Sequence, residues 1–173
     1  MAKKIIQMSL SSSSIQNAIK ELDNYKRELL NKEKILLEKL RDIGVGEASV
    51  RFTTAAYDGV NDVSVTYSPA DKGYAIMAKG QAVAFIEFGT GVYYNSGEPY
   101  PIPRPEGIVG IGEYGKRRGQ GRAWFYQGDA GTNGIPQDGG LVKTRGNPAA
   151  MPMWYASEEM RKSILKIARE VFG

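Results

Sequence analysis

The stretch Ile86-Glu87-Phe88-Gly89-Thr90-Gly91 lies in the middle of the chain, and Asn147-Pro148-Ala149-Ala150-Met151-Pro152-Met153 lies close to its end. The first stretch reads as the end of a short helix, 82–88, stopped by Gly89. Gly89 and Gly91 most simply supply positive φ where the chain turns sharply, and Thr90 can satisfy a local backbone group. The second stretch leads into an amphipathic helix at 152–172.

Glu87 stands between two apolar residues ahead of this turn and allows two interpretations. A catalytic one would make it a general base whose pKa is raised by its apolar neighbours. A structural one has it accepting hydrogen bonds from backbone N–H groups or pairing with an arginine such as Arg104 or Arg145. We favour the structural interpretation, because the sequence supplies no obvious catalytic partner and ion-pair networks also perturb carboxylates.

The two stretches and their order resemble the tail-completion and head-to-tail joining family of long-tailed bacteriophages, the minor tail-component proteins of the neck. Members of that family carry Ala, Glu, an aromatic residue, Gly and Thr in a mid-chain run, and Pro-Ala with a hydrophobic residue before a last helix. Here 82–90 and 148–153 carry the resemblance. The chain departs from the simpler members by a long insertion from about Tyr93 to Gly146.

The resemblance implies a structural virion protein of the neck or tail, made in the host cytoplasm. It implies an α+β fold and a homo-oligomeric, hexameric ring that completes the tail, contacts tail tube or sheath proteins, and docks to the head connector. Genomic DNA would pass through this ring. The matching residues would hold the junctions of the fold's core: Glu87, Phe88, Gly89, Thr90, Gly91, Pro148, Ala149 and Met153.

Composition restricts the chemistry open to this chain. Its 173 residues, 42% of them apolar, suit a single domain, 1–173, with a core of its own. There is no His and no Cys. Thiol nucleophiles, His-based triads, Cys/His zinc sites and iron–sulfur clusters are therefore excluded. We expect no enzymatic activity, no cofactor and no metal.

Charge and hydropathy point away from membranes and give little support for nucleic acid. The formal net charge of +4 is mild, and acidic and basic residues are interspersed in both terminal helices. The start of the chain turns polar too early for a secretory signal, and no apolar run approaches the ~20 residues that span a bilayer. We expect a soluble protein of the cytosol without a membrane partner.

The sequence pattern of the N-terminal region predicts a tail, 1–12, followed by a long helix, 13–43. Ser13 and Gln16 form a capping box, apolar residues recur at helical spacing, and Gly44 is the expected stop. Leu30, Ile35 and Leu37 lie off the main apolar stripe. They would either meet a second partner surface or simply be exposed, and the sequence leaves both open.

The remaining elements complete a prediction of α+β class. Period-two alternation between 47 and 79 predicts three short antiparallel strands, which include Val50 and Phe52. An extended Gly/Pro-rich insertion, 93–146, is expected to contain strands at 123–126 and 141–144. We therefore predict long N-terminal and C-terminal helices packed on a small antiparallel sheet.

Two features of the insertion allow a rival function. Gly110-Ile111-Gly112-Glu113-Tyr114-Gly115 matches the dinucleotide fingerprint, but the flanking prolines and basic residues do not fit the strand and helix that it needs. A basic, Gly-rich segment could be a solvated loop, an arm that contacts a neighbouring subunit, or an arm that contacts DNA, and we favour the first two. Its residues are Lys116, Arg117, Arg118, Arg122, Trp124 and Tyr126. The alternative function is thus a nucleic-acid- or nucleotide-binding module that uses 110–122.

Five aspartates read as turn formers, because each stands beside or close to Gly, Asn or Pro and none has the spacing of a calcium loop. They are Asp58, Asp62, Asp71, Asp129 and Asp138.

Overall fold

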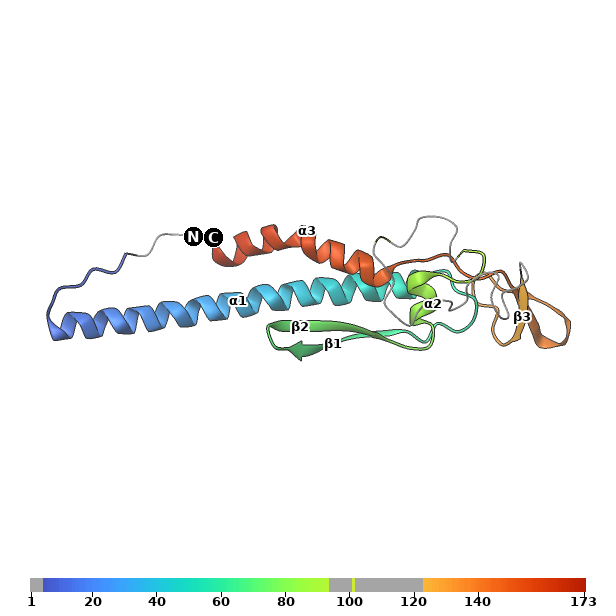
Figure 1. The fold of residues 1–173 in the computed structure, drawn as a ribbon, viewed down its shortest axis with the longest axis horizontal. Coiled ribbons are helices and arrows are strands. Elements are labelled where there is room, and N and C mark those ends of the chain that lie inside the picture. The colour runs from blue at the N-terminus through green and yellow to red at the C-terminus, as the bar shows by residue number, and fades with distance from the viewer. Residues whose placement is uncertain (1–4, 94–100, 102–122) are drawn as a thin grey trace.

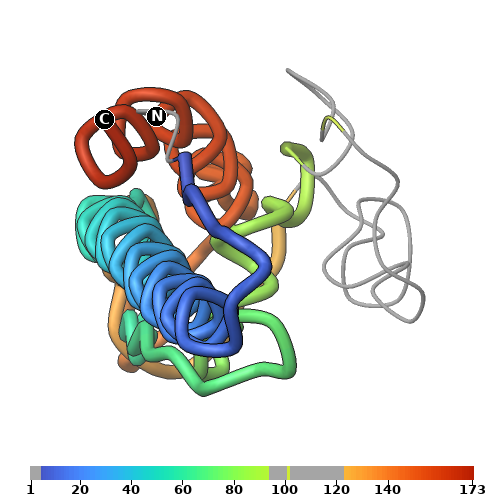
Figure 2. The backbone as a smooth tube through the Cα atoms, turned by 90° about the vertical axis from the view of Figure 1, so that its left-hand side faces the viewer, coloured from blue at the N-terminus to red at the C-terminus, as the bar shows by residue number. Residues whose placement is uncertain are grey.

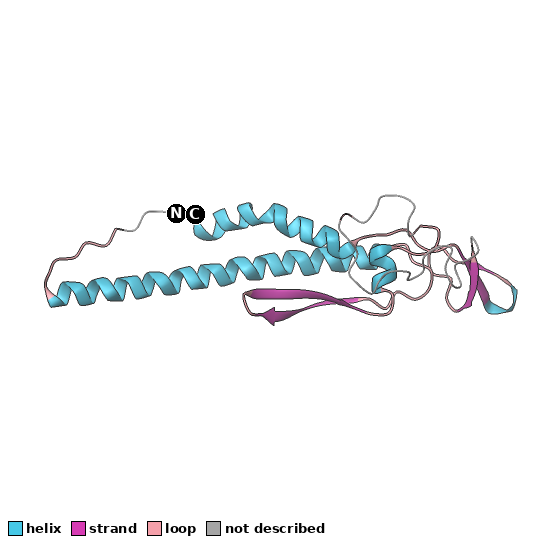
Figure 3. Ribbon diagram, viewed as in Figure 1, coloured by secondary structure: helices cyan, strands magenta, loops and turns pink. Residues whose placement is uncertain are grey.

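A computed structural model describes residues 5–93, 101 and 123–173, and it has the expected α+β arrangement (Figure 1). A long helix, α1 (Ser12–Thr54), carries the closing helix α3 (Pro152–Phe172) along one side and a β-hairpin along another (Figure 3). Seen along their length, the two helices lie side by side (Figure 2). The buried core lies where α1, the short helix α2 (Val83–Phe88) and α3 meet, and comprises Ala48, Phe52, Ala82, Ile86 and Ala156.

Helix α1 begins and ends at residues other than those predicted. Its N-cap is Ser11, whose hydroxyl accepts a hydrogen bond from the Ser14 N–H, so the predicted capping box on Ser13 is wrong. The helix also continues through Gly44 to Thr54. A Cβ at Gly44 would lie 2.3 Å from Ile76 Cδ1 and 2.6 Å from Met160 Sδ. Gly44 therefore permits close packing of the hairpin and α3, which outweighs its low helix propensity.

The predicted set of three strands reduces to a two-stranded hairpin of β1 (Ser64–Ala70) and β2 (Gly73–Lys79), paired antiparallel from Ser64↔Lys79 to Ala70↔Gly73. Val50 and Phe52 belong to α1, where Phe52 is only 2% exposed. The alternation of Val50 and Phe52 with polar residues is therefore coincidental, because tertiary packing holds this segment as part of a helix. The Arg41 guanidinium of α1 lies 4.4 Å from the Tyr67 ring centre and so joins helix to hairpin.

A second sheet lies within the predicted insertion and has the strand order β3-β5-β4. Strand β3 covers Trp124–Gln127, one residue later than predicted, and β5 covers Leu141–Thr144, as predicted. The short β4 (Ile135–Pro136) and a 3₁₀ turn, η2 (Asp138–Gly140), lie between them in sequence. The rest of the predicted insertion, 94–100 and 102–122, lies outside the described residues.

The other two helices agree with the prediction. Helix α2 (Val83–Phe88) ends at Gly89, and α3 spans Pro152–Phe172. The residue before α3, Met151, has a left-handed φ of 51° although it is not glycine. Such a conformation is strained for a residue with a side chain and persists only where its surroundings fix it.

Helix α3 covers only part of α1. Lys39 Nζ contacts Glu170 Oε2 at 3.0 Å, which places the end of α3 beside the middle of α1 (Figure 1). The N-terminal part of α1 extends beyond it, and Ile15, Ile19 and Leu22 there are 40%, 53% and 55% exposed. We call these three residues the free stripe. Leu30 and Ile35 are also exposed, whereas Leu37 is half-buried. No described helix is long and apolar enough to cross a membrane.

Candidate functional site

The two stretches that carry the family resemblance lie against each other in the structure. The Thr90 N–H donates to the Asn147 carbonyl at 2.8 Å, and the Asn147 N–H donates back to Thr90 Oγ1 at 2.8 Å. The Val92 N–H donates to the Arg145 carbonyl at 3.0 Å, and the Ala150 N–H donates to the Ile86 carbonyl at 2.9 Å. Backbone groups far apart in sequence thus satisfy one another, as buried polar groups must. We call this paired segment, 86–92 with 145–154, the junction.

Glu87 connects the junction to α3. The residue is 3% exposed, and its carboxylate accepts hydrogen bonds from the first-turn N–H groups of Met153 at 2.8 Å and Trp154 at 3.1 Å. Free N–H groups and the helix dipole both favour a negative charge at this place. The prediction that Glu87 accepts backbone N–H donors is confirmed. Arg104, one of its suggested partners, lies outside the described residues.

Glycines allow the two halves of the junction to approach closely. Gly89 and Gly91 have φ of 73° and 60°, as predicted from the sharp turn. A Cβ at Gly91 would lie 2.3 Å from the Arg145 carbonyl oxygen and 2.7 Å from the Trp124 ring. Only glycine combines this φ with this contact.

The other predicted junction residues differ in exposure. Phe88 is buried, Met153 is partly buried and packs on the core cluster, Ala149 is partly buried, and Pro148 is exposed.

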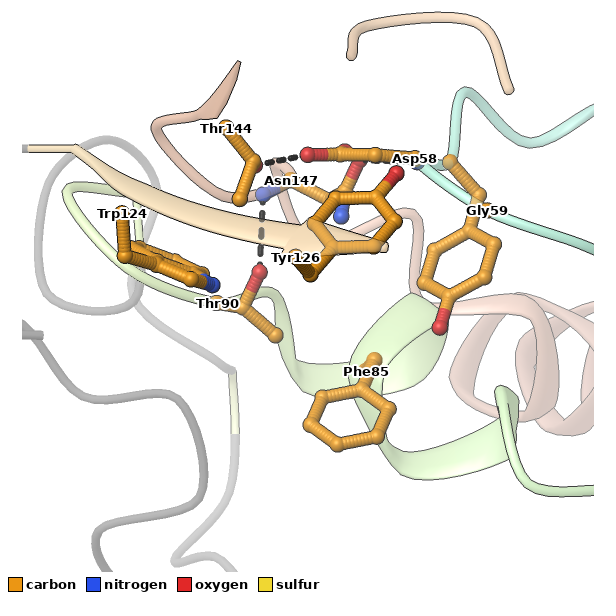
Figure 4. Close-up of a pocket in the computed structure, with 9 residues that line it drawn as sticks. Asp58, Gly59, Phe85, Thr90, Trp124, Tyr126, Thr144 and Asn147 are labelled. Atoms are coloured by element: carbon orange, nitrogen blue, oxygen red, sulfur yellow. Dashed lines mark hydrogen bonds between the residues drawn. The ribbon is translucent and has the colours of Figure 1, made fainter. Parts of the chain in front are cut away.

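A cavity of about 250 Å³ opens beside the junction (Figure 4). Aromatic rings form much of its wall, and hydroxyl, amide and carboxyl groups stand at one side. Its lining residues are Tyr57, Asp58, Gly59, Phe85, Thr90, Trp124, Tyr126, Thr144 and Asn147. They come from the segment after α1, from α2, from β3 and β5, and from both halves of the junction.

Asp58 is the buried charged group of this cavity, with 8% of its surface exposed. The Thr144 hydroxyl donates to Asp58 Oδ2, and the Asp58 N–H donates to Asn147 Oδ1 at 2.9 Å. Within the described part of the chain, Asp58 Oδ1 has no hydrogen-bond partner. Burial raises the pKa of this carboxyl, and hydrogen bonds from its own backbone and from Asn147 oppose the rise.

Two tyrosines share the environment of Asp58. Burial raises the pKa of Tyr57 and of Tyr126, and the negative charge of Asp58 adds to both shifts. The Tyr126 hydroxyl donates to the Asp129 carbonyl at 2.6 Å, which holds its ring in place against the cavity. Both phenols therefore stay neutral at physiological pH.

The segment that carries Asp58 is held from two sides. The Thr132 N–H donates to the Tyr57 carbonyl at 2.7 Å, and Asn133 Nδ2 donates to Asn147 Oδ1 at 3.0 Å. At Gly131 a Cβ would lie 2.1 Å from the Tyr57 carbonyl oxygen, so the two loops touch backbone to backbone. The carboxyl of Asp58 is thus fixed by groups contributed from 130–133 and from 144–147.

The predicted basic arm is only partly described. Lys116, Arg117, Arg118 and Arg122, with the Gly110–Gly115 motif, lie outside the described residues. Trp124 and Tyr126 lie on β3 and line the cavity, while Phe125 between them is 54% exposed on the other face of the strand. Trp124 and Tyr126 are two positions apart, so on a strand their side chains lie on the same face; this spacing was the signal that could have indicated a cavity wall.

Asp58 and Tyr57 were missed as site residues, since Asp58 next to Gly59 reads as a turn. Among the described residues there is no group of three or more His, Cys, Asp or Glu side chains placed to hold a metal ion. No protein-family model, curated protein or solved structure matches this chain.

Proposed function

We propose that this chain is a structural protein of the phage neck or tail, one subunit of a homo-oligomeric ring that completes the tail and joins it to the head connector. The support from the site is that the two motifs behind the resemblance make one physical unit. Their hydrogen bonds and glycine contacts join α2 to α3, which is what core-junction residues would do. Six copies, with tail tube or sheath proteins and the head connector as neighbours, follow from the resemblance alone.

The observation that carries the proposal is the free stripe of α1. Ile15, Ile19 and Leu22 recur at helical spacing, so they lie on one face of the helix and remain exposed together. A helix in water draws most of its stability from the burial of such a face. A subunit whose long helix extends past its own core therefore supports assembly by packing of that helix against another copy.

Polar residues around the stripe suit contact between identical chains. The Glu28 and Lys32 side chains pair at 3.5 Å one turn apart, and acids and bases alternate along the same half of α1. A surface of mixed sign does not repel its own copy, unlike a surface of one sign. Self-association of this half of the helix is therefore electrostatically permitted.

Native mass spectrometry and negative-stain electron microscopy of the purified full chain test the proposal. We expect closed rings of six copies, and a double substitution Ile19→Glu with Leu22→Glu should leave monomers that unfold as cooperatively as before. The matched control, Asn17→Glu with Asn24→Glu, adds the same charge to the opposite face of the helix and should still form rings. A chain that stays monomeric at all concentrations would contradict the proposal.

The rival function, binding of nucleic acid or nucleotide through 110–122, is tested on the same preparation. Nucleic-acid binding through basic residues weakens steeply as salt rises, and a bound nucleotide raises Tm. A monomer that retains DNA with a steep salt dependence would replace the ring proposal by this alternative.

A further inference from the structure

The second sheet has one face turned away from the cavity. Side chains alternate between the two faces of a strand, and residues opposite each other on paired strands share a face. One face of β3 and β5 lines the cavity. On the other face, Lys143 of β5 has Phe125 of β3 on one side and Ile135 of β4 on the other, and Leu141 lies two residues away along β5. We call these four residues the outer face.

The apolar side chains of the outer face are open to solvent. Phe125, Ile135 and Leu141 are 54%, 51% and 37% exposed, whereas Val142 on the other face of β5 is buried. Apolar side chains that gather on one surface, unlike scattered ones, mark a site of interaction. The outer face therefore calls for an occupant that is itself apolar.

A cyclic ring of more than two copies needs two different contact surfaces on each subunit. An isologous contact uses the same patch on both partners and closes with two copies, whereas heterologous contacts generate rings. The free stripe supplies one such surface. The outer face lies far from it, because the N-terminal end of α1 and strand β3 are at opposite ends of the long axis of the molecule (Figure 1). Each chain thus carries two separate exposed apolar surfaces.

We propose that the free stripe of one copy packs across the outer face of the next copy, so that the chains join head to tail. This contact deepens the ring proposed above and rests on it. Every copy gives its stripe to one neighbour and receives the stripe of the other. In a closed ring both apolar surfaces of every chain are then covered.

The two surfaces agree in length. Seven residue steps separate Ile15 from Leu22, which is about 10 Å along a helix that rises ~1.5 Å per residue. Neighbouring strands lie ~4.8 Å apart, so Phe125 and Ile135, on either side of Lys143, are also about 10 Å apart. A helix laid across the three strands therefore keeps apolar side chains against apolar side chains over the whole stripe.

Charge favours this pairing over contact between two outer faces. Asp23 follows Ile19 by four residues and adjoins Leu22, so it borders the free stripe. Within the described part of the chain, neither Asp23 nor Lys143 takes part in an ion pair. The flexible stem of Lys143 can bring its ammonium to the Asp23 carboxylate of the neighbour. Two outer faces would instead place Lys143 against its own copy, and like charges weaken association.

Crosslinking between introduced cysteines tests the contact, because the natural chain has no Cys. Full chains carrying Ile19→Cys and a larger tagged form carrying Leu141→Cys are mixed, assembled and treated with a short bismaleimide. We expect a product that joins the two different chains, and little product from either variant alone. The matched control, Asn24→Cys mixed with Leu141→Cys, uses the opposite face of α1 and should give none. A dominant product that joins Ile19→Cys to itself, or Leu141→Cys to itself, would overturn the proposal.

Reversal of the two charges gives a second test that leaves the apolar surfaces intact. Asp23→Lys or Lys143→Glu alone sets like charges together and should raise the concentration at which half of the chains assemble about tenfold. Both changes in one chain restore opposite charges and should return that concentration to within about twofold of its original value. Asp71→Lys makes the same change in the exposed hairpin turn and should have no effect. Analytical ultracentrifugation measures these midpoints, and a double variant no better than the single ones would refute the pairing of Asp23 with Lys143.

The outcomes separate this contact from the ring itself. Closed rings in electron micrographs without the mixed crosslink would overturn the head-to-tail contact and leave the proposed function standing. Open filaments with the mixed crosslink would support the contact and contradict closure. A chain that stays monomeric at all concentrations would contradict both.

Discussion

The two halves of α1 share one helix and one pattern of apolar residues but have opposite surroundings. In the C-terminal half, Ala48 and Phe52 are buried under α3 and the second helix. In the N-terminal half, the free stripe of Ile15, Ile19 and Leu22 faces solvent. Periodicity therefore identifies an apolar face, but it does not say whether the same chain covers that face.

Removing the Phe52 ring is the largest expected perturbation and sharpens this comparison. Phe52→Ala should lower the free energy of unfolding by about 3–5 kcal/mol, because the ring is 2% exposed and its removal leaves a cavity. Ile19→Ala at the other end should change it by less than ~0.5 kcal/mol in dilute monomer, as exposed positions do. Urea denaturation measures both. Equal losses would mean that the free stripe is buried within the monomer.

A substitution at Gly91 tests how tightly the covered end is built. Gly91→Ala should cost about 3 kcal/mol, because a Cβ there meets the Arg145 carbonyl at 2.3 Å in addition to the strain of positive φ. Gly139→Ala has similar strain, with φ of 75°, but open space around it, and should cost only about 1 kcal/mol. Thermal unfolding compares the two, and equal effects would refute a steric role for the junction.

Glu87 gives the next largest effect. Glu87→Ala should cost about 2 kcal/mol, because the N–H groups of Met153 and Trp154 lose their buried acceptor. Glu87→Gln keeps one acceptor oxygen and should cost about half as much. Glu159→Gln, exposed on the same helix, should stay within ~0.5 kcal/mol. Chemical denaturation measures these free energies of unfolding. If Glu87→Ala left the value unchanged, α3 would not depend on this carboxylate.

The smallest effect concerns Asp62, which lies at the link between the hairpin and α2. Its carboxylate accepts hydrogen bonds from the N–H groups of Gln81 and Ala82 at 2.7 and 3.0 Å, and these bonds lower its pKa. A lowered pKa contributes stability that is present above the unfolded pKa of about 3.9 and lost as pH falls through the folded value. Asp62→Asn should therefore reduce the loss of stability on acidification, measured as urea midpoints against pH. If the urea midpoint of Asp62→Asn fell at acidic pH as steeply as that of the unmodified chain, this assignment would be contradicted.

The α+β class, α3 and β5 could be predicted because their signals are local. Helical spacing with Pro152 at the start marks α3, and Leu141-Val142-Lys143-Thr144 is a short run with β-branched residues that follows two glycines and precedes Gly146. The end of α1 could not be predicted, since the partners that make glycine suitable at position 44 are Ile76 and Met160. The role of Asp58 in the cavity could not be predicted for the same reason, because its hydrogen-bond partners, Thr144 and Asn147, lie far along the chain.

The close contact at Gly44 has a consequence for the order of events during synthesis. Glycine lowers helix stability by about 1 kcal/mol per residue relative to alanine, and α1 carries both Gly44 and Gly46. The Met160 side chain that packs there belongs to α3, which is synthesised long after Gly44. The nascent helix should hence stay frayed beyond Gly44 until α3 has left the ribosome, and stable folding of the covered end should begin only then.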